Sequence, residues 1–362
     1  MAKLGEICLI NPKSCTLRDD TEVSFIPMTK VGEHGEFDAS EIKNYSEVKK
    51  GFTNFQNGDI LFAKITPCME NGKGAIAHNM KNGIGFGSTE FHVLRPDTDK
   101  ITREWLYYLT TWKTFRKEAE RNMTGSAGQK RVPKTFLENY VVNLPDIDTQ
   151  KSENKILRKV DDLISLCKQQ LAKLDELVKA RFVEMFGDPI RNDKHFVQKT
   201  GKSLFCFSSG KFLQEEKRFQ HGFPVYGGNG ITWYTDIPLV KKPTIIIGRV
   251  GAYCGNVRMV NVPVWITDNA IYIKEFKTRE LSLHFLLMLM KYMKFSNYAD
   301  YSGQPKITQK PLETLIYIVP PLELQNRFAA FVERVDQQKQ TVQQSLEKLE
   351  LMKKALMQEY FG

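Results

Sequence analysis

The sequence predicts an α+β protein in which two mixed α/β domains alternate with two long α-helices that pack on each other as a coiled coil. The first observation is an internal repeat without gaps at an offset of 175 residues: Gly128-Gln129 returns as Gly303-Gln304, and Phe186-Gly187 returns as Phe361-Gly362. The second is a heptad pattern of apolar residues inside the recurring stretch. The third is the set of short, glycine-bounded β-type runs outside it. A period this long is a whole domain with its connector, so we expect a pseudo-two-fold internal repeat.

The repeat divides the 362 residues into four segments. We expect a first domain, head 1, at residues 1–144, a first helix at 145–187, a second domain, head 2, at 188–319, and a second helix at 320–362. The net charge of +10 divides among them as +2, 0, +8 and 0, so the heads carry all of the excess. Neutral helices of mixed charge are typical of protein–protein contacts, and basic heads are typical of domains that bind a polyanion. Charge alone does not identify nucleic acid as the ligand, because many basic proteins bind nothing anionic.

Head 1 has β-type runs followed by a helix. The runs are residues 23–28, 59–65 and 91–94, and Thr102 is placed to cap a helix that contains Trp105 and continues to Phe115. The glycine-rich segment 83–87 lacks the third glycine of a dinucleotide-binding loop, so we interpret it as a flexible turn.

The first long helix should begin just after Pro145 and end at Phe186-Gly187. It would have about 37 residues and a length of roughly 55 Å. A helix of that length cannot bury its apolar stripe in its own domain. Its stripe, broken only by Arg181, consists of Leu157, Val160, Ile164, Cys167, Leu171, Leu174, Val178 and Met185.

Head 2 repeats this plan. Its β-type runs are residues 223–226, 243–248 and 270–273, followed by a helix from about 280 to 298. Thr278-Arg279-Glu280 resembles Thr102-Arg103-Glu104, which suggests that both mark the start of a helix.

The second long helix follows Pro320-Pro321 and has lysines, Lys339 and Lys353, where the first has Ile164 and Val178. Two unrelated surface helices would not keep a gapless register, so we expect the two helices to pack on each other. The seam residues of the second helix are Val332, Val335, Val342, Leu346, Leu349, Leu356 and Tyr360.

Each head ends in a polar loop that could hold a phosphate. The loops are residues 125–131 and 301–306, and they carry Gln129, Lys130 and Arg131 in head 1 and Gln304 and Lys306 in head 2. Exposed backbone amides beside a cation are typical of phosphate contacts.

No catalytic or metal-binding motif is recognisable. The sequence has no Walker motif, no amino-methyltransferase motif and no His-Glu-x-x-His, and its six cysteines form no Cys-x-x-Cys pair. Pro145-Asp146 with Glu153-Asn154-Lys155 imitates a nuclease motif, but the spacing is too short, and we interpret these as solvated helix residues. We expect reduced thiols, no signal peptide and no membrane span.

At full length the chain resembles the specificity (S, HsdS) subunit of type I restriction-modification systems. The resemblance rests on the order head, helix, head, helix, on the Gly-Gln loop and Pro-x-x-x-x-Gln before each helix, and on three segments, residues 180–189, 223–230 and 246–249. The sequence ends at Phe361-Gly362 without a tail, so a shortened or engineered chain is an alternative expectation.

The resemblance implies a DNA-binding subunit without catalysis of its own, located in the cytoplasm. It implies that the heads are target recognition domains, each reading one half of an asymmetric bipartite sequence in double-stranded DNA. It also implies that the helices pack as an antiparallel coiled coil, set the spacing and dock two modification subunits, which methylate adenine with S-adenosylmethionine. Restriction subunits would join through the complex and use ATP and Mg.

Side chains that can pair with base edges are the candidate DNA contacts. In head 1 they are Lys64, Lys73, Ser88 and Thr89, and in head 2 they are Asn229, Arg249, Arg258 and Gln304, beside the loop residues given above. Structural roles are open alternatives: Asn229 as a turn residue, Arg249 as a partner of Asp268, and Tyr226, Trp233 and Tyr253 as core.

Two other functions stay open. The chain could be the specificity portion of a fused methyltransferase-nuclease. It could also be a two-headed module that recognises protein or carbohydrate instead of DNA.

Overall fold

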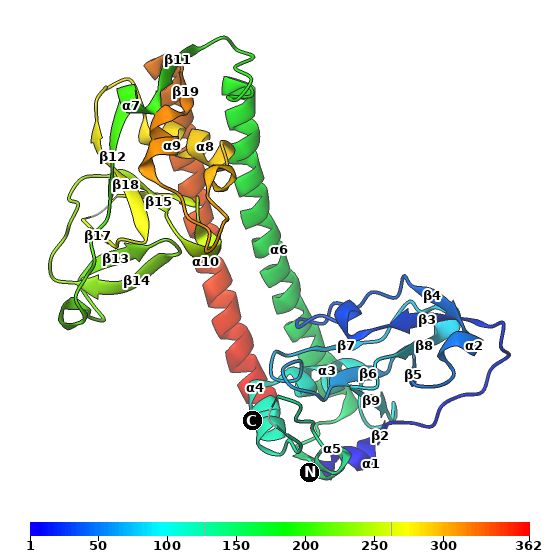
Figure 1. The fold of residues 1–362 in the computed structure, drawn as a ribbon. Helices are drawn as coiled ribbons and strands as arrows, with labels where there is room; N and C mark the ends of the chain where they lie inside the picture. The colour runs from blue at the N-terminus through cyan, green and yellow to red at the C-terminus, as the bar shows by residue number, and fades with distance from the viewer. Residues whose placement is uncertain (127, 262) are drawn as a thin grey trace. The chain divides into compact units, whose positions relative to one another are not determined.

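The computed structural model describes residues 1–126, 128–261 and 263–362. It confirms the predicted class, with mixed helix and strand content and two long helices, α6 (Ile147–Phe186) and α10 (Leu322–Phe361) (Figure 1). The chain forms two compact units. Unit 1 comprises residues 1–166 and 346–362, and unit 2 comprises residues 167–345. Each unit therefore contains one head and a part of each long helix, whereas the division expected from the sequence follows the secondary structure.

Head 1 contains two four-stranded sheets. One is antiparallel, in the order β2 (Cys8–Ile10), β9 (Phe91–Pro96), β6 (Ile60–Ala63), β7 (Gly74–Ile76). The other has the order β4 (Ile42–Asn44), β3 (Glu22–Ile26), β8 (Ile84–Gly87), β5 (Thr53–Gln56), with β3 and β8 parallel. The remaining elements are α1 (Leu4–Ile7), α2 (Tyr45–Val48), α3 (Arg103–Thr111), α4 (Lys113–Arg121), α5 (Lys134–Asn139) and the pair β1 (Ala2–Lys3) with β10 (Val141–Val142). The predicted runs at 23–28, 59–65 and 91–94 are β3, β6 and β9.

Head 2 has the same plan with fewer strands. Its antiparallel sheet has the order β12 (Phe205–Ser209), β18 (Ala270–Phe276), β15 (Thr244–Gly248), β16 (Val257–Val260). Its second sheet is β14 (Gly230–Thr235), β13 (Phe223–Gly227), β17 (Trp265–Ile266), with β13 and β17 parallel. The remaining elements are α7 (Gly201–Leu204), α8 (Leu283–Tyr292), α9 (Gln309–Thr314) and the pair β11 (Val197–Thr200) with β19 (Ile316–Val319). The predicted runs at 223–226, 243–248 and 270–273 are β13, β15 and β18.

Burial along α6 and α10 confirms the predicted seam. Every predicted seam residue is buried or half-buried, Lys339, Lys353 and Arg181 are half-buried, and most of the residues between them are exposed. In unit 1, Lys353 donates a hydrogen bond to Asp161; in unit 2, Lys339 donates one to Asp175. In both pairs the residue numbers add to 514, as they must for antiparallel helices in one register. The two seam lysines thus reach carboxylates on the opposite helix.

A buried glutamine attaches each head to the start of the long helix that follows it. Gln150 accepts a hydrogen bond from the backbone N–H of Thr102 at 2.8 Å and donates to the carbonyls of Lys100 and Pro145 at 3.0 and 2.9 Å. Gln325 accepts from the N–H of Ser282 at 2.9 Å and donates to the carbonyls of Glu280 and Pro320 at 2.8 Å each. Both side chains are fully buried, so their amide groups need these partners. The matching Pro-x-x-x-x-Gln segments therefore have the same structural role.

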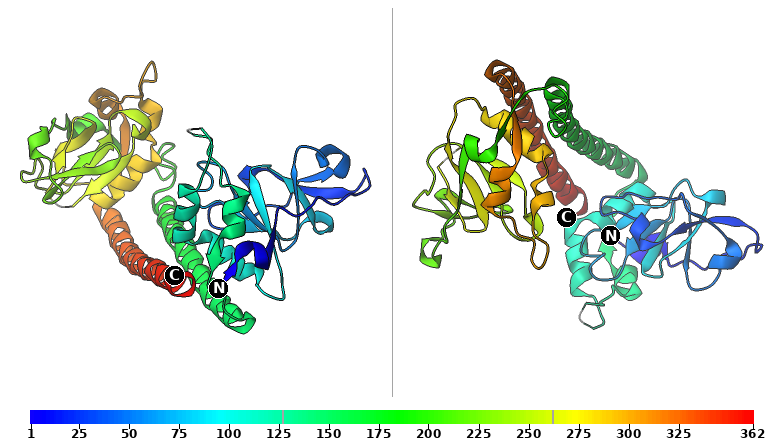
Figure 2. Two further views of the ribbon diagram at one scale, coloured as in Figure 1. Left: turned by 90° about the horizontal axis from the view of Figure 1, so that it is seen from below. Right: turned by 45° about the horizontal axis from the view of Figure 1, so that its top comes forward.

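Aromatic residues at the helix ends complete the core of each head. In unit 2, Phe186 packs on Phe285 and Phe328 with ring centroids 4.7 and 5.5 Å apart. The first turns of α10 join the same core as β15 and α8, which lie beside them in Figures 1 and 2. In unit 1, Phe361 packs on Trp105 at 4.8 Å. The repeated Phe-Gly thus marks the point where each helix docks on a head.

Four expectations from the sequence are wrong. Residues 84–87 form strand β8 and not a flexible turn. Their glycines are needed because a Cβ on Gly87 would lie 2.1 Å from the carbonyl oxygen of Ile26 in the parallel strand β3. The helix after Thr102 is two helices, because Trp112 has an extended backbone with ψ of 130° and begins α4.

The other two concern helix residues. Thr278-Arg279-Glu280 precedes α8, whose N-cap is Ser282; the glutamine contacts make Ser282 the counterpart of Thr102. Glu153 and Asn154 are not solvated. Glu153 accepts from the indole N–H of Trp105 at 2.8 Å, and Asn154 donates to the hydroxyl of Thr102 at 2.8 Å.

Candidate nucleic-acid interface

Three segments of head 1 meet where β6 ends. Backbone hydrogen bonds run from Lys64 N–H to the Glu90 carbonyl at 2.9 Å, from Val132 N–H to the Lys64 carbonyl at 2.9 Å, and from Thr66 N–H to the Lys130 carbonyl at 3.0 Å. We call the segments 64–66, 88–90 and 130–132 junction 1. It joins the end of β6, the loop between β8 and β9, and the end of the polar loop predicted to hold phosphate.

Head 2 builds the same junction with different side chains. The bonds run from Arg249 N–H to the Asn269 carbonyl, from Ile307 N–H to the Arg249 carbonyl, and from Gly251 N–H to the Pro305 carbonyl, each at 2.9 Å. We call the segments 249–251, 267–269 and 305–307 junction 2. Lys64 thus corresponds to Arg249, and Arg131 to Lys306. The backbone frame is shared, so any difference in recognition between the heads has to come from side chains.

The cation of the polar loop in junction 1 is paired with an acid. Arg131 donates from Nε and Nη2 to the two carboxylate oxygens of Glu90 at 2.9 and 2.8 Å. The hydrogen bonds with Arg131 lower the pKa of Glu90 below its ordinary value and raise that of Arg131. Glu90 was not among the residues suggested by the sequence. In junction 2 its counterpart is the neutral Asn269, and Lys306 is exposed.

A buried histidine fixes the polar loop of junction 1 to the sheet. The Nε2 atom of His92 on β9 lies 2.8 Å from the carbonyl oxygen of Val132, and its Nδ1 atom lies 3.0 Å from Nδ2 of Asn11. A carbonyl only accepts, so Nε2 donates and Nδ1 accepts from the amide. Burial lowers the pKa of His92, which suits this neutral form. In the sequence, His92 had no partner at a recognisable spacing.

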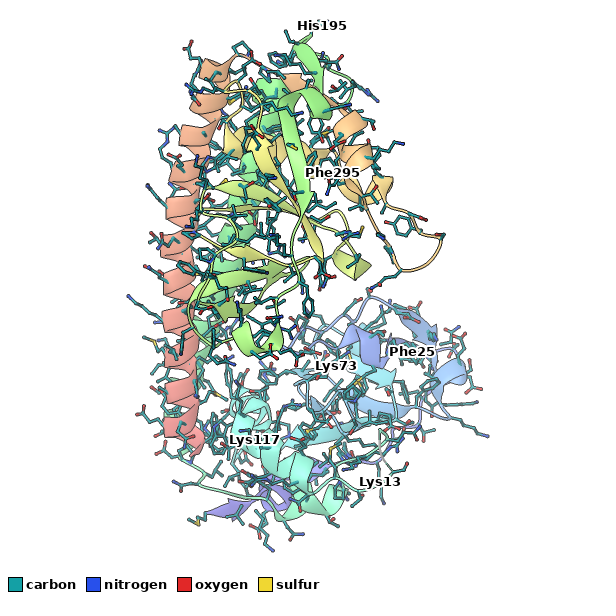
Figure 3. The ribbon with its side chains drawn as sticks, turned by 60° about the vertical axis from the view of Figure 1, so that its left-hand side comes forward. Lys13, Phe25, Lys73, Lys117, His195 and Phe295 are labelled. Carbon is teal, nitrogen blue, oxygen red and sulfur yellow. The ribbon has the colours of Figure 1, made fainter. Side chains whose placement is uncertain are left out.

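The other candidates of head 1 lie around junction 1. Ser88 and Thr89 are in the loop between β8 and β9, where Thr89 is exposed and the Ser88 hydroxyl accepts from the N–H of Glu90 at 3.2 Å. Gln129 and Lys130 are exposed on the polar loop. Lys73, labelled in Figure 3, donates from Nζ to the carbonyl of Met28 at 3.2 Å. The structure therefore brings together Lys64, Ser88, Thr89, Gln129, Lys130 and Arg131. Lys73 lies beside them, but its side chain makes a structural contact.

Four candidates of head 2 lie around junction 2. Asn229 is exposed in the two-residue turn between β13 and β14, and this turn is close to β15, since a Cβ on Gly228 would lie 3.5 Å from the Gly248 Cα atom. Arg249 donates from Nη1 to the carbonyl of Asp268 at 3.2 Å, which is a contact with the backbone and not with the carboxylate. The amide nitrogen of Gln304 lies 3.5 Å from the position of a Cβ on Gly251. Lys306 bridges to Val250.

Arg258 lies on β16, opposite Ile246 of β15. Its guanidinium lies against the turn between β13 and β14 that contains Asn229, because a Cβ on Gly230 would lie 3.5 Å from Nη1 of Arg258. The aromatic residues nearby are only partly core. Tyr226 packs against a small cluster between the sheets, whereas Trp233 and Tyr253 are 45% and 48% exposed, so the core alternative is wrong for these two.

Within the part of the chain that the structure describes, no group of three or more His, Cys, Asp and Glu residues could hold a metal ion. Over the same residues, no helix has the length and apolar character needed to cross a membrane. The interface that remains is a pair of polar junctions with exposed amide, hydroxyl and cationic side chains, the chemistry that phosphates and base edges require.

Comparison with protein families gives a match over most of the chain. The model described as "Type I restriction modification DNA specificity domain" matches residues 1–176 and again residues 196–351. The two matched ranges correspond to the two heads with much of the helix that follows each.

Relatives and solved structures agree with this match. The specificity subunits of the type I restriction enzymes EcoAI and EcoEI of Escherichia coli are 47% and 41% identical to this chain over 179 residues, or 48% of it. The aligned parts span only 30% and 29% of those subunits. A putative MjaX specificity subunit of Methanocaldococcus jannaschii is 26% identical over 92% of this chain and 83% of its own length.

Two solved structures share the fold. The S subunit of a type I restriction-modification system from M. genitalium covers 100% of this chain and 95% of its own, with a TM-score of 0.64 and 18% identity. A chain from a study of complex assembly and conformational transition in a type I R-M system covers 99% of this chain and 96% of its own, with a TM-score of 0.56 and 17% identity.

Proposed function

Because this chain belongs to the family of type I restriction modification DNA specificity domains and is a specificity subunit of such a system, we propose that each head reads one half of a split, asymmetric DNA sequence. The observation that carries this proposal is the junction built twice on one backbone plan with different side chains. Because the two junctions have the same backbone arrangement, both heads can approach duplex DNA in the same way. Because their side chains differ, they can contact different bases. The long helices connect the two heads, so once one head has bound DNA, binding by the other head is intramolecular. The distance between the two half-sites then becomes part of the specificity.

The long helices have the surface expected of a docking platform. Leu163, Leu166 and Leu177 of α6 are 48%, 58% and 47% exposed although they are large apolar residues on a helix of balanced charge. Exposed apolar side chains on such a surface are typical of protein contacts. In the proposal, two modification subunits bind there and methylate adenine with S-adenosylmethionine, and restriction subunits that use ATP and Mg join through the complex in the cytoplasm. The chain itself binds DNA and catalyses neither step.

Mapping methylated adenine in the host genome, with and without this gene, tests the proposal. We expect one asymmetric bipartite sequence to be methylated in the parent and to lose its methylation completely in the deletion strain. Complementation with the gene should restore the same sequence. Methylation that persists without the gene, or a methylated sequence without a split, would contradict it.

The exposed loop cations should contribute affinity without sequence preference. Replacing Lys130, Arg131 and Lys306 by Ala is expected to weaken binding of the assembled complex to all duplexes by similar factors. The slope of log affinity against log salt should become shallower by about 0.9 for each phosphate that is no longer neutralised. Arg131 should contribute least, since Glu90 already neutralises it. Fluorescence anisotropy over a salt series measures this. A matched control removes three cations elsewhere: Lys168, Arg191 and Lys274. A loss of discrimination at one base pair instead would show that the loop cations read bases.

A further inference from the structure

Arg258 occupies a position where head 1 has a small core residue. The N–H of Ala63 donates to the carbonyl of Lys73 at 3.3 Å, and the N–H of Gly248 donates to that of Asn256 at 2.8 Å. Lys73 is therefore equivalent to Asn256, and strand β7 to strand β16. Two residues further along these strands, Ala75 corresponds to Arg258. Ala75 is fully buried in the core between the sheets of head 1. Head 2 therefore has a guanidinium where head 1 needs only a methyl group.

The guanidinium has few polar neighbours. Arg258 lies opposite Ile246, which belongs to an apolar cluster between the two sheets of head 2, together with Val260, Ile266 and Tyr272. Gly230, which has a φ of +127°, lies against the guanidinium, since a Cβ there would be in van der Waals contact with Nη1 of Arg258 at 3.5 Å. Any side chain on Gly230 would be strained by that φ.

Two polar atoms at this place have no hydrogen-bond partner among the residues that the structure describes. They are Nε of Arg258 and Oγ1 of Thr267, both buried. Thr267 belongs to junction 2 and lies beside the same glycine turn, since a Cβ on Gly227 would lie 3.6 Å from its hydroxyl. Over the described residues, no carboxylate lies within ion-pair distance of Arg258. A buried polar group without a partner costs stability, so this arrangement is typical of a site completed by a ligand.

The shape of the guanidinium limits the ligand. A planar fork of donors suits two acceptors side by side, as presented by a phosphate or by O6 and N7 of guanine in the major groove. A phosphate contact carries no sequence information, and head 1 has Ala75 at the equivalent position. Exposed cations on the polar loops are already available for the phosphate backbone. A cation present in one head alone, recessed beside the exposed Asn229, fits a base contact.

We propose that Arg258 is a specificity-determining residue of head 2 and that it reads a guanine in the half-site of that head through O6 and N7. This inference rests on the proposed function, because it assigns one base contact within the DNA site of head 2. The other half-site, read by head 1, has no counterpart of this contact.

The test maps methylation by complexes that contain the full chain with Arg258→Lys or Arg258→Gln. We expect each variant to keep the half-site of head 1 and to lose preference for a single G·C pair in the other half-site, by roughly 5- to 150-fold. Lysine keeps the charge but not the fork, so it separates base reading from a phosphate contact. Lys274→Ala, an exposed cation on β18, is the matched control and should leave the sequence unchanged.

Three results would overturn the inference. An unchanged methylated sequence in both variants would make Arg258 structural. A uniform loss for Arg258→Gln with normal activity for Arg258→Lys would make it a phosphate contact. A loss of base preference in the half-site of head 1 would show that Arg258 does not read the half-site of head 2. Thermal unfolding of each variant checks that head 2 is folded. If the unaltered complex methylates no bipartite sequence, the proposed function itself fails, and this outcome is distinct from the other three.

Discussion

A chain with Leu171→Glu and Leu346→Glu is expected to lose the pairing of its long helices and, with it, assembly with modification subunits, while both heads stay folded. Leu346 is 7% exposed and Leu171 is half-buried on the seam. Leu346→Glu removes buried packing, for which about 2–5 kcal/mol per leucine is usual, and Leu171→Glu removes a part of that. The charge at position 346 would be buried, which costs several kcal/mol more.

The heads should survive because neither leucine belongs to a head core. Those cores take their helix residues from the ends of α6 and α10, such as Phe186 and Phe328 in unit 2 and Leu157 and Met357 in unit 1. Co-purification with modification subunits and thermal unfolding measure the two effects separately. The matched control, Ala172→Glu with Gln344→Glu, adds the same charge at exposed positions that lie away from the seam and from Leu163, Leu166 and Leu177, and it should assemble normally. A seam variant that assembles and methylates the parental sequence would contradict the role given to the seam.

The features that the sequence predicted are those with a local signature. Heptad spacing predicts the seam from Leu157 to Met185, because a period of 3.5 residues is a property of the helix alone. The β-type runs were found for the same reason. The gapless register identified Gln150 and Gln325 as equivalent, although not as the buried amides that hold the heads to the helices.

The errors arose where long-range pairing overrides local preference. Glycines suggest a turn, but Gly85 and Gly87 form a central strand because Ile26 and Phe55 approach too closely for any side chain. Thr278-Arg279-Glu280 matched Thr102-Arg103-Glu104 in letters, whereas the contact with a buried glutamine selects Ser282.

The candidate site could be predicted only in part. Polar residue types indicated Lys64, Arg249 and the loop cations, and the two junctions bring these together. The partners Glu90 and Asn269 were not predicted, since they lie far from the loops in sequence and meet them only through the pairing of β6 with β9 and of β15 with β18. The buried Nε of Arg258 and Oγ1 of Thr267, which have no hydrogen-bond partner among the described residues, are likewise a result of packing.

Exchange of head 2 is expected to change one half of the methylated sequence and to leave the other half intact. The exchanged segment would be residues 188–319, replaced by the corresponding head of a relative. Head 2 shares its core with Phe182, Phe186 and Phe328 of the long helices, so the donor head has to offer matching apolar residues at those contacts. The repeated junctions predict independent readers, because the hydrogen bonds of each junction stay within its own head.

Mapping methylated adenine in cells that carry the exchanged chain as their only specificity subunit is the most direct measurement of the account. The expected result is a bipartite sequence with the parental half-site of head 1, the donor's half-site in place of the other, and the parental spacing. A parallel exchange of residues 188–319 for the same segment of this chain with silent codon changes controls for expression. A change in both half-sites, or in neither while the complex is active, would contradict the assignment of one reader to each head.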